Sequence, residues 1–272
     1  FNMGGEGQLY LGSMTAAVIA IYSPLPPIVT IILSLAGGAL VGALWVLIPA
    51  MLKVSLGINE IVTTLMSSNI AIYLTAYLVN GVLRNPDSGA PETVRLDRSL
   101  RLPQLIQGTK INTGIIIALI LIVIIYIYFY RTKGGLKVRM VGMNPLFSQT
   151  VGINDRRVLF SSMLASGALA GLAGALVTMG IEYRFISGFS PGYGMLGITV
   201  ALIGGLHPVG VLVSAVFYGT LMNGATTMQM NTDVPFALVS LIQGIVVMLV
   251  TSQLKWPRAL KFKKLRKGER TT

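Results

Sequence analysis

The chain contains no cysteine and a single histidine, His207, among its 272 residues. Without cysteine there can be no disulfide, no thiol catalysis and no cysteine metal site. One histidine, placed beside Pro208, cannot supply an HExxH pair or a multi-histidine metal site, and we expect it to have a structural role. The sequence also lacks the G-x-x-x-x-G-K-[ST] loop that cradles ATP phosphates and the G-x-S-x-G elbow of hydrolases. We therefore predict no catalytic site, no metal site and no cofactor in the chain itself.

Charged residues are scarce as well. They make up 11% of the chain, and hydrophobic residues make up 53%, whereas a soluble domain carries about 25% charged residues. The apolar runs are long and continuous rather than alternating, which disfavours a β-barrel. The 31 glycines are typical of helices that pack closely in lipid. We therefore expect an all-α, polytopic helical membrane protein.

The net charge of +12 raises the question of nucleic-acid binding, but the basic residues are strongly clustered. Fourteen of the 21 Lys and Arg residues lie in residues 131–157 and 253–272, next to apolar runs. Clusters of this kind follow the positive-inside rule for segments on the cytoplasmic side of a membrane, and they favour contact with anionic lipid. The distribution indicates a lipid bilayer as the partner and argues against nucleic acid.

Apolar runs approach the length of about 20 residues that a membrane-spanning helix needs. Two of them contain G-x-x-x-G pairs that allow close packing, Gly38 with Gly42 and Gly167 with Gly171. Residues 204–208 (GGLHP) interrupt a late run, so we expect two short segments meeting at a turn, like the broken helices of transporters. The prediction is about eight transmembrane or half-membrane segments: 9–22, 28–52, 61–78, 115–130, 158–181, 195–203, 209–222 and 236–250.

The two basic clusters also predict the topology. With residues 131–157 and 253–272 in the cytoplasm, the loop at 81–112 lies outside, in spite of its five basic residues. Its three acidic residues count little under the rule. We expect a transmembrane domain over residues 1–252 and a basic cytoplasmic tail over residues 253–272. The chain starts inside a patterned segment without a signal peptide, so we expect further residues to precede it.

Polar motifs stand at the ends of the apolar runs, and the first is NMGGEGQ at residues 2–8. Its three glycines allow an irregular backbone, while Glu6 and Gln8 place strong polar groups at the membrane edge. The simpler interpretation is an interfacial turn, with Glu6 at the positive end of a helix.

The second motif, GINEIVTTLMSSN at residues 57–69, opens the third span. Asn59 suits a helix N-cap, and Glu60 suits the positive end of the helix dipole. The hydroxyl residues that follow are spaced i, i+4, so they share faces of the helix. They either bond to carbonyls of the preceding turn or hydrogen-bond a solute, and both interpretations stay open for Thr63, Thr64, Ser67 and Asn69.

The third motif lies in residues 131–157, which hold six basic residues and a single acidic one, Asp155. Gly142, Asn144-Pro145 and Gly152 would frame one short helix beneath the bilayer, available to a partner in the cytoplasm. The alternative is an ordinary basic connector between two spans.

Together these motifs resemble those of the permease subunits of ABC importers, in the branch that carries nucleosides and simple sugars. The patterns N-x-G-x-E-G-Q, G-x-N-E-x-x-x-T-x-M and G-x-N-P-x-A-A-x-x-x-G-I are met in order at residues 2–8, 57–66 and 142–153. The last is met with one departure, because Phe147 and Ser148 stand where alanines are usual. Residues 194–210 are similar to a late glycine-rich segment of the family, and the resemblance runs from residue 2 to about residue 250.

The resemblance implies a transmembrane subunit that forms the pathway for a nucleoside or simple sugar in the bacterial cytoplasmic (inner) membrane. It implies a second permease subunit, identical or different, an external substrate-binding protein, and an ATPase subunit that binds ATP and Mg. The implied substrate-pathway residues are Glu6, Gln8, Asn59, Glu60, Thr63, Thr64, Ser67 and Asn69. The implied ATPase-coupling residues are Lys137, Arg139, Gly142, Asn144, Pro145 and Gly152.

Two other functions are less consistent with the residues. A proton-coupled carrier should have ionisable residues deep in its spans, whereas Glu6, Glu60, Glu182 and Asp233 stand at segment ends. A membrane-embedded enzyme would need a nucleophile–base pair or a metal cluster, and the sequence offers neither. We expect Glu182, Arg184 and Phe185, just beyond the fifth span, to contact either an external binding protein or the membrane interface.

Overall fold

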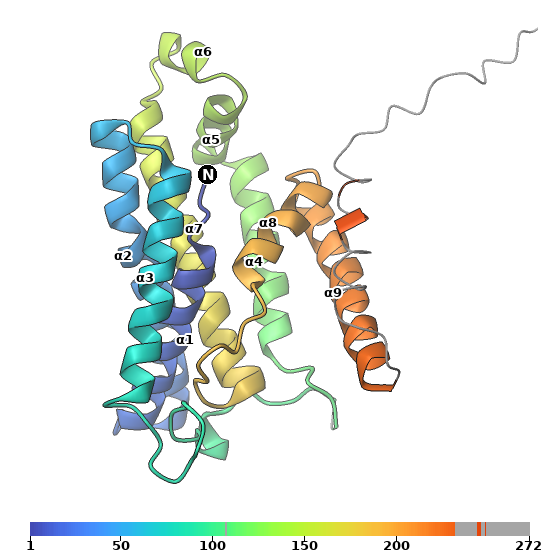
Figure 1. Cartoon of the computed structure of the whole chain (residues 1–272). Helices are drawn as coiled ribbons and strands as arrows, with labels where there is room; N and C mark the ends of the chain where they lie inside the picture. Colours follow the sequence, from blue (N-terminus) through green and yellow to red (C-terminus); the bar gives the residue numbers. More distant parts are fainter. Residues whose placement is uncertain (107, 232–243, 246–247, 249–272) are drawn as a thin grey trace, which may run out of the picture. The chain divides into compact units, whose positions relative to one another are not determined.

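The structure, a computed structural model, describes residues 1–106, 108–231, 244–245 and 248. These residues form helices and connecting loops with two isolated β-bridges and no strand, so the all-α fold is confirmed. The helices in Figure 1 are α1 (Gly5–Tyr22), α2 (Pro27–Leu56), α3 (Glu60–Asn80), α4 (Gly114–Arg131), α5 (Lys133–Met143), α6 (Pro145–Thr150), α7 (Asp155–Val177), α8 (Tyr193–Ile203) and α9 (Pro208–Asn231). A π-helical turn, Thr178–Glu182, follows α7 directly.

The chain divides into two compact units, residues 1–213 and residues 214–272. The first unit holds α1 to α8 and the start of α9. In the second unit, the described residues are the rest of α9 and the helical residues 244, 245 and 248. The expected span at 236–250 lies almost entirely outside the described residues, and the basic tail at 253–272 lies wholly outside them.

Five of the described helices are long and apolar enough to cross a membrane: α2, α3, α4, α7 with its π-helical turn, and α9 over Pro208–Ala225. Helix α8 has 11 residues, about half the length that a crossing requires. Helix α1 carries Glu6 and Gln8 in its first turn, and most of its residues are buried by protein rather than facing outward. The chain is therefore a multi-pass membrane protein, and its described part includes one apolar helix of about half the crossing length, α8.

The helices agree with the spans expected from the sequence to within a few residues, with two corrections. The segment 209–222 was expected to be short, but it belongs to α9, which has 24 residues. The break before it is confirmed, since Gly205 and Leu206 both adopt positive φ and Pro208 starts the new helix. The short helix framed by Asn144-Pro145 and Gly152 is present as α6, and the second correction is that residues 131–157 also contain α5, which is capped by Thr132.

Helices α1, α2 and α7 form the centre of the first unit, and their backbones touch. A Cβ added at Gly42 would lie 2.2 Å from the carbonyl oxygen of Gly167, and one at Gly171 would lie 2.2 Å from that of Gly38. Only glycine permits helices to approach so closely. The two G-x-x-x-G pairs of the sequence therefore pack against each other. The whole set, called the glycine contact below, is Gly12, Gly38, Gly42, Gly167, Gly171 and Gly174.

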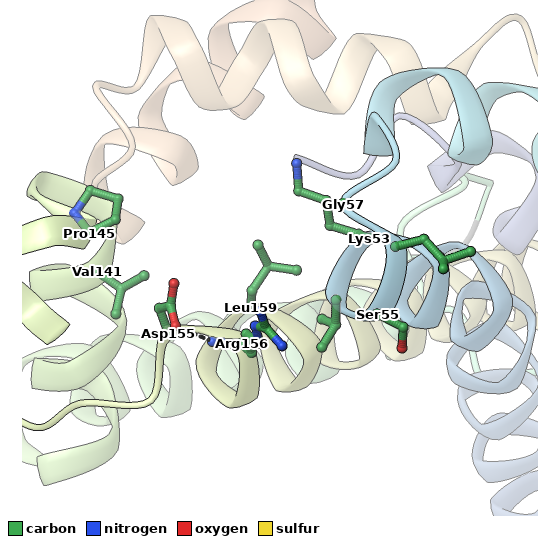
Figure 2. Close-up of a pocket in the computed structure, with 10 residues that line it drawn as sticks. Lys53, Ser55, Gly57, Val141, Pro145, Asp155, Arg156 and Leu159 are labelled. Atoms are coloured by element: carbon green, nitrogen blue, oxygen red, sulfur yellow. Dashed lines mark hydrogen bonds between the residues drawn. The ribbon is translucent and has the colours of Figure 1, made fainter.

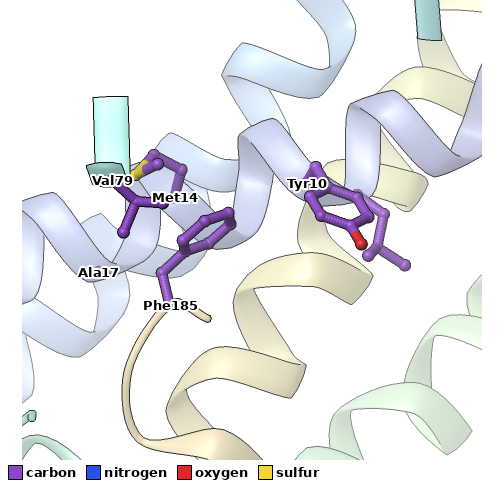
Figure 3. Packing of buried hydrophobic residues seen from close by; sticks show 6 residues of the cluster. Tyr10, Met14, Ala17, Val79 and Phe185 are labelled. Atoms are coloured by element: carbon purple, nitrogen blue, oxygen red, sulfur yellow. The ribbon is translucent and has the colours of Figure 1, made fainter. Parts of the chain in front are cut away.

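An apolar cluster extends from α1 to α3 and to the chain that follows α7. Figure 3 shows Met14 and Ala17 of α1 and Val79 of α3 around the ring of Phe185. The Phe185 ring stands edge-on to Tyr10, with ring centres 6.1 Å apart, and is fully buried. Phe185 is therefore a core residue and offers no surface to an external partner.

The loop at residues 81–112 runs beside the same stretch of chain. The backbone N–H of Thr93 donates to the carbonyl of Phe185 at 2.9 Å. The buried carboxylate of Glu92 binds the guanidinium of Arg184 at 2.7 Å. Arg184 is thus held within the chain, and the loop closes this end of the helices.

The basic residues of the loop are partly explained by one aromatic ring. The guanidinium of Arg101 lies 4.8 Å from the centre of the Tyr183 ring and donates to the carbonyl of Leu96 at 2.6 Å. Arg95 approaches the same ring at 6.0 Å. Cation–π contacts and a hydrogen bond to a carbonyl hold the guanidinium groups of Arg95 and Arg101. These two basic residues therefore have structural roles in the loop, which the positive-inside rule does not consider.

The glycine contact leads to a stability prediction. We expect Gly171→Ala to destabilise the protein by about 1–3 kcal/mol or more, because its methyl group must push α2 and α7 apart. The control is Gly219→Ala in α9, where an added Cβ meets open space and the gain in helix propensity is about 1 kcal/mol. Thermal unfolding in detergent measures both changes. Equal midpoints for the two variants would contradict the assignment.

Candidate functional site

The first candidate site is the segment 2–8, called the α1 start below. The three glycines allow an irregular backbone here, but the helix already begins at Gly5, with Glu6 in its first turn. The glycines serve close contact instead, since a Cβ added at Gly7 would lie 2.6 Å from the Cα of Ser68. The α1 start is therefore packed directly against α3.

Hydrogen bonds tie the α1 start to two neighbouring helices. The backbone N–H groups of Met3 and Gly7 donate to the hydroxyls of Thr64 and Ser68 on α3, at 3.1 and 2.8 Å. Towards α7, the amide nitrogen of Asn2 donates to the Ser166 hydroxyl at 3.0 Å and to the amide oxygen of Gln8 at 2.9 Å. The side chain of Gln8 is almost fully buried, so this small network is internal.

The third neighbour of the α1 start is α8. The carboxylate of Glu6 accepts a hydrogen bond of 2.5 Å from the backbone N–H of Gly194, the second residue of α8. A Cβ added at Gly194 would lie 2.2 Å from the backbone nitrogen of Glu6. Of the residues predicted for the substrate pathway, Glu6, Gln8 and Thr64 therefore meet at the α1 start.

The remaining pathway residues on α3 do not join them. Asn59 caps the helix by accepting from the N–H of Ile61, and Glu60 binds Lys53 of α2 at 2.6 Å. Asn69 is exposed, and its amide donates to the carbonyl of Leu65 in its own helix. Thr63 and Ser67 are half-buried between the buried and the exposed sides of α3. The polar residues of α3 thus divide among different faces of the helix.

The second candidate site is residues 131–157, called the α5–α6 segment below. Asn144 and Pro145, which the sequence predicted to start a short helix, do start α6. The Asn144 side chain accepts from the N–H of Phe147, and Pro145 is the first residue of the helix. Gly152 has φ +80° in the turn that ends it. A Cβ at Gly142 would meet open space, so packing gives no reason for that glycine.

The two basic coupling residues differ in their surroundings. The guanidinium of Arg139 lies 4.8 Å from the centre of the Tyr130 ring at the end of α4, which holds α5 against α4. Lys137 is exposed on α5. Arg139 therefore orients the segment, while Lys137 is available to a partner.

Sequence reasoning missed the apolar side chains of this segment. Met143, Leu146 and Phe147 are 87%, 76% and 56% exposed, and Val151 is exposed beside them. Ser148 points inward and is fully buried, which explains why a small residue stands there. The sequence carries part of this signal, because Phe147 and Val151 are four positions apart and such residues share one side of a helix.

A pocket of about 470 Å³ separates the α5–α6 segment from the end of α2. Figure 2 shows Lys53 and Gly57 on one side of it and Val141, Pro145 and Asp155 on the other. The exposed face of α6 and this recess lie at the same end of the helices. That end of the helices therefore carries an exposed apolar surface and a pocket lined by both acidic and basic residues.

Comparison with known proteins identifies the family. The family described as "Branched-chain amino acid transport system / permease component" matches residues 1–251. The chain belongs to this family of permeases. Its relatives include the guanosine ABC transporter permease protein NupP of Bacillus subtilis, which is 36% identical to the chain. The alignment covers 93% of this chain and 73% of that protein.

Two further relatives have similar coverage. The glucose ABC transporter permease protein TsgB13 of Haloferax volcanii is 31% identical over 93% of the chain and 70% of its own length. The nucleoside ABC transporter permease protein NupB of Lactococcus lactis is 31% identical over 92% and 71%. No solved structure matches the chain.

These findings confirm the recognition made from the motifs. The chain is a permease, the translocation subunit of an ABC importer. Permease subunits of this kind are not themselves ATPases. The permease therefore has two candidate sites in different places. The α1 start lies among the helices, and the α5–α6 segment lies at their α6 end.

The contact between α1 and α3 gives the second prediction. In the permease, Thr64→Val keeps the shape of the buried side chain but leaves the N–H of Met3 without an acceptor, so we expect a loss of about 1–3 kcal/mol in unfolding free energy. Thr63→Val is the matched control, because the Thr63 hydroxyl bonds to carbonyls of its own helix. Denaturation of both purified variants compares them. A Thr64 variant as stable as the control would contradict the bond.

Proposed function

We propose that this permease carries a neutral nucleoside or simple sugar into the cell. The observation that carries the proposal is the similarity over nearly the whole chain to permeases named for guanosine, nucleosides and glucose. Three of the described carboxylates near the spans already have partners, which supports a neutral solute. Glu60 and Glu92 are paired with Lys53 and Arg184, and Glu6 accepts from the N–H of Gly194. A neutral solute needs hydrogen-bonding groups that hold it weakly enough for release.

The pathway is proposed to run beside the α1 start and α3. Hydroxyl and amide groups there suit a solute rich in hydroxyls, and the half-length helix α8 supports a polar passage nearby, because broken helices in transporters line such passages. The residues proposed to line or border it remain Glu6, Gln8, Asn59, Glu60, Thr63, Thr64, Ser67 and Asn69.

Energy is proposed to come from a separate ATPase subunit, with its own ATP and Mg, that binds the α5–α6 segment. The exposed apolar face of α6 supports this proposal, since a contiguous apolar surface outside the membrane region marks a protein contact. The coupling residues proposed from the sequence, Lys137, Arg139, Gly142, Asn144, Pro145 and Gly152, frame and orient that face. Met143, Leu146 and Phe147 are added to them as the anchoring side chains.

The other proposed partners follow from the same assignment. A second permease subunit, identical or different, completes the pathway, and an external binding protein delivers the solute. The permease is proposed to lie in the bacterial cytoplasmic (inner) membrane, with loop 81–112 outside and residues 131–157 and 253–272 in the cytoplasm. The basic clusters support this orientation.

The coupling proposal is tested with Phe147→Glu. A charge in the apolar contact should lower guanosine-dependent ATP hydrolysis and uptake by about tenfold or more, as for the loss of an interface anchor. The measurement uses proteoliposomes containing the permease, its ATPase partner and the binding protein. The control is Val82→Glu, which adds the same charge at an 84% exposed position in loop 81–112. Unimpaired coupling in the Phe147 variant would contradict the proposal.

Orientation is tested with single cysteines in this cysteine-free chain. An impermeant maleimide should label Asp87→Cys on intact cells and Met143→Cys only after permeabilisation, because both positions are exposed at opposite ends of the helices. The unmodified chain controls for background labelling. The reverse pattern would invert the proposed topology.

A further inference from the structure

Helix α8 begins in an unusual place for a helix of a membrane protein. It has 11 residues and is preceded by a non-helical segment in which Gly188 and Gly192 have φ +75° and +94°. The first N–H groups of any helix lack partners within the helix. Away from water each unpaired group costs several kcal/mol, so the start of α8 requires acceptors from elsewhere in the protein.

Two side chains supply these acceptors. The Ser190 hydroxyl accepts from the N–H groups of Gly192 and Tyr193, at 3.2 and 3.0 Å. The carboxylate of Glu6 accepts from Gly194 at 2.5 Å. Ser190 belongs to the same stretch of chain as α8, whereas Glu6 comes from α1. Glu6 thus fastens the half-length helix to another helix, and its negative charge suits the positive end of α8.

The contact extends along one side of α1. The hydroxyl of Tyr10, one turn after Glu6, accepts from the N–H of Ser190 at 3.4 Å, and its ring lies 4.8 Å from that of Phe189. At Glu6 itself the two backbones touch, because a Cβ added at Gly194 would lie 2.7 Å from the carbonyl carbon of Gly5. The chain leading into α8 therefore follows α1 closely.

The opposite sides of the α1 start are held by α3 and α7, through Thr64, Ser68 and Ser166. The α1 start thus joins α8 to two membrane-spanning helices. A displacement of α3 or α7 that moves the α1 start must also move α8, as long as the bond from Glu6 to Gly194 holds. Packed protein transmits such displacements because it has little free volume.

We propose that Glu6 is a positioning residue that fastens α8 to α1 and does not contact the solute. Its role is to keep the half-length helix in register with α1 during transport. Glu6 then borders the proposed pathway and acts on it indirectly, through α8. The inference uses the proposed function only for the location of the pathway, since the bond and the backbone contact exist whatever the solute is.

The test uses a reporter cysteine at Leu196, a half-buried position on α8, in the assembled transporter in proteoliposomes. Glu6→Ala removes the acceptor, and we expect maleimide labelling of the reporter to rise about tenfold, as for the loss of a charged hydrogen bond. Glu6→Gln keeps an acceptor oxygen and should restore most of the protection. Gly194→Ala should match Glu6→Ala, because its methyl group separates the backbones. Gly197→Ala, whose Cβ meets open space, is the control.

Uptake measurements distinguish positioning from solute contact. Glu6→Ala should lower the maximal rate about tenfold and leave the half-saturating solute concentration unchanged, and Glu6→Gln should recover most of the rate. A changed half-saturating concentration in Glu6→Gln, or a Gly194→Ala variant that behaves like Gly197→Ala, would overturn the proposal. Labelling needs no transported solute, so an incorrect solute assignment leaves that part of the test intact.

Discussion

The structure depends on the contact of three helix backbones at the glycine contact. Because no side chain separates them there, α2 and α7 lie directly against each other and against α1 at Gly12. This close approach makes α1 the central helix, with most of its residues buried. Close packing of this kind is what holds helices together in lipid, where apolar side chains gain nothing by leaving the hydrocarbon.

The central position of α1 explains why its first turn can be polar. A lipid-facing helix could not begin with Glu6 and Gln8 without exposing them to hydrocarbon. Here Gln8 is buried beside Asn2, and Glu6 receives the N–H of Gly194. The N–H groups of Met3 and Gly7 have no partner within the helix because they lie at its start, and the glycines let α3 approach closely enough for Thr64 and Ser68 to accept from them. Polarity and close packing therefore depend on each other at the α1 start.

Properties that reside in the local sequence were predictable. The spans follow from uninterrupted apolar runs, and the frame of α6 follows from the capping chemistry of Asn144 and Pro145. Burial and hydrogen bonds that involve residues distant in the sequence were not predictable. Thr64 and Asn69 belong to one polar motif, yet α1 buries the first and leaves the second exposed. Likewise, Glu6 finds its partner 188 residues away, a distance over which residue spacing gives no information.

Helix α7 connects the two candidate sites. It begins within the last residues of the α5–α6 segment, where Asn154 caps its first turn. It then passes through the glycine contact at Gly167 and Gly171 and bonds to the α1 start through Ser166. Beyond its π-helical turn the chain continues to Phe185 and into α8. Because the glycine contact has no side chains that could repack, a tilt of α7 at its α6 end must shift α1 and α2 as well. The α1 start and α8 would then move together, which is the coupling that a permease driven from outside its own chain requires.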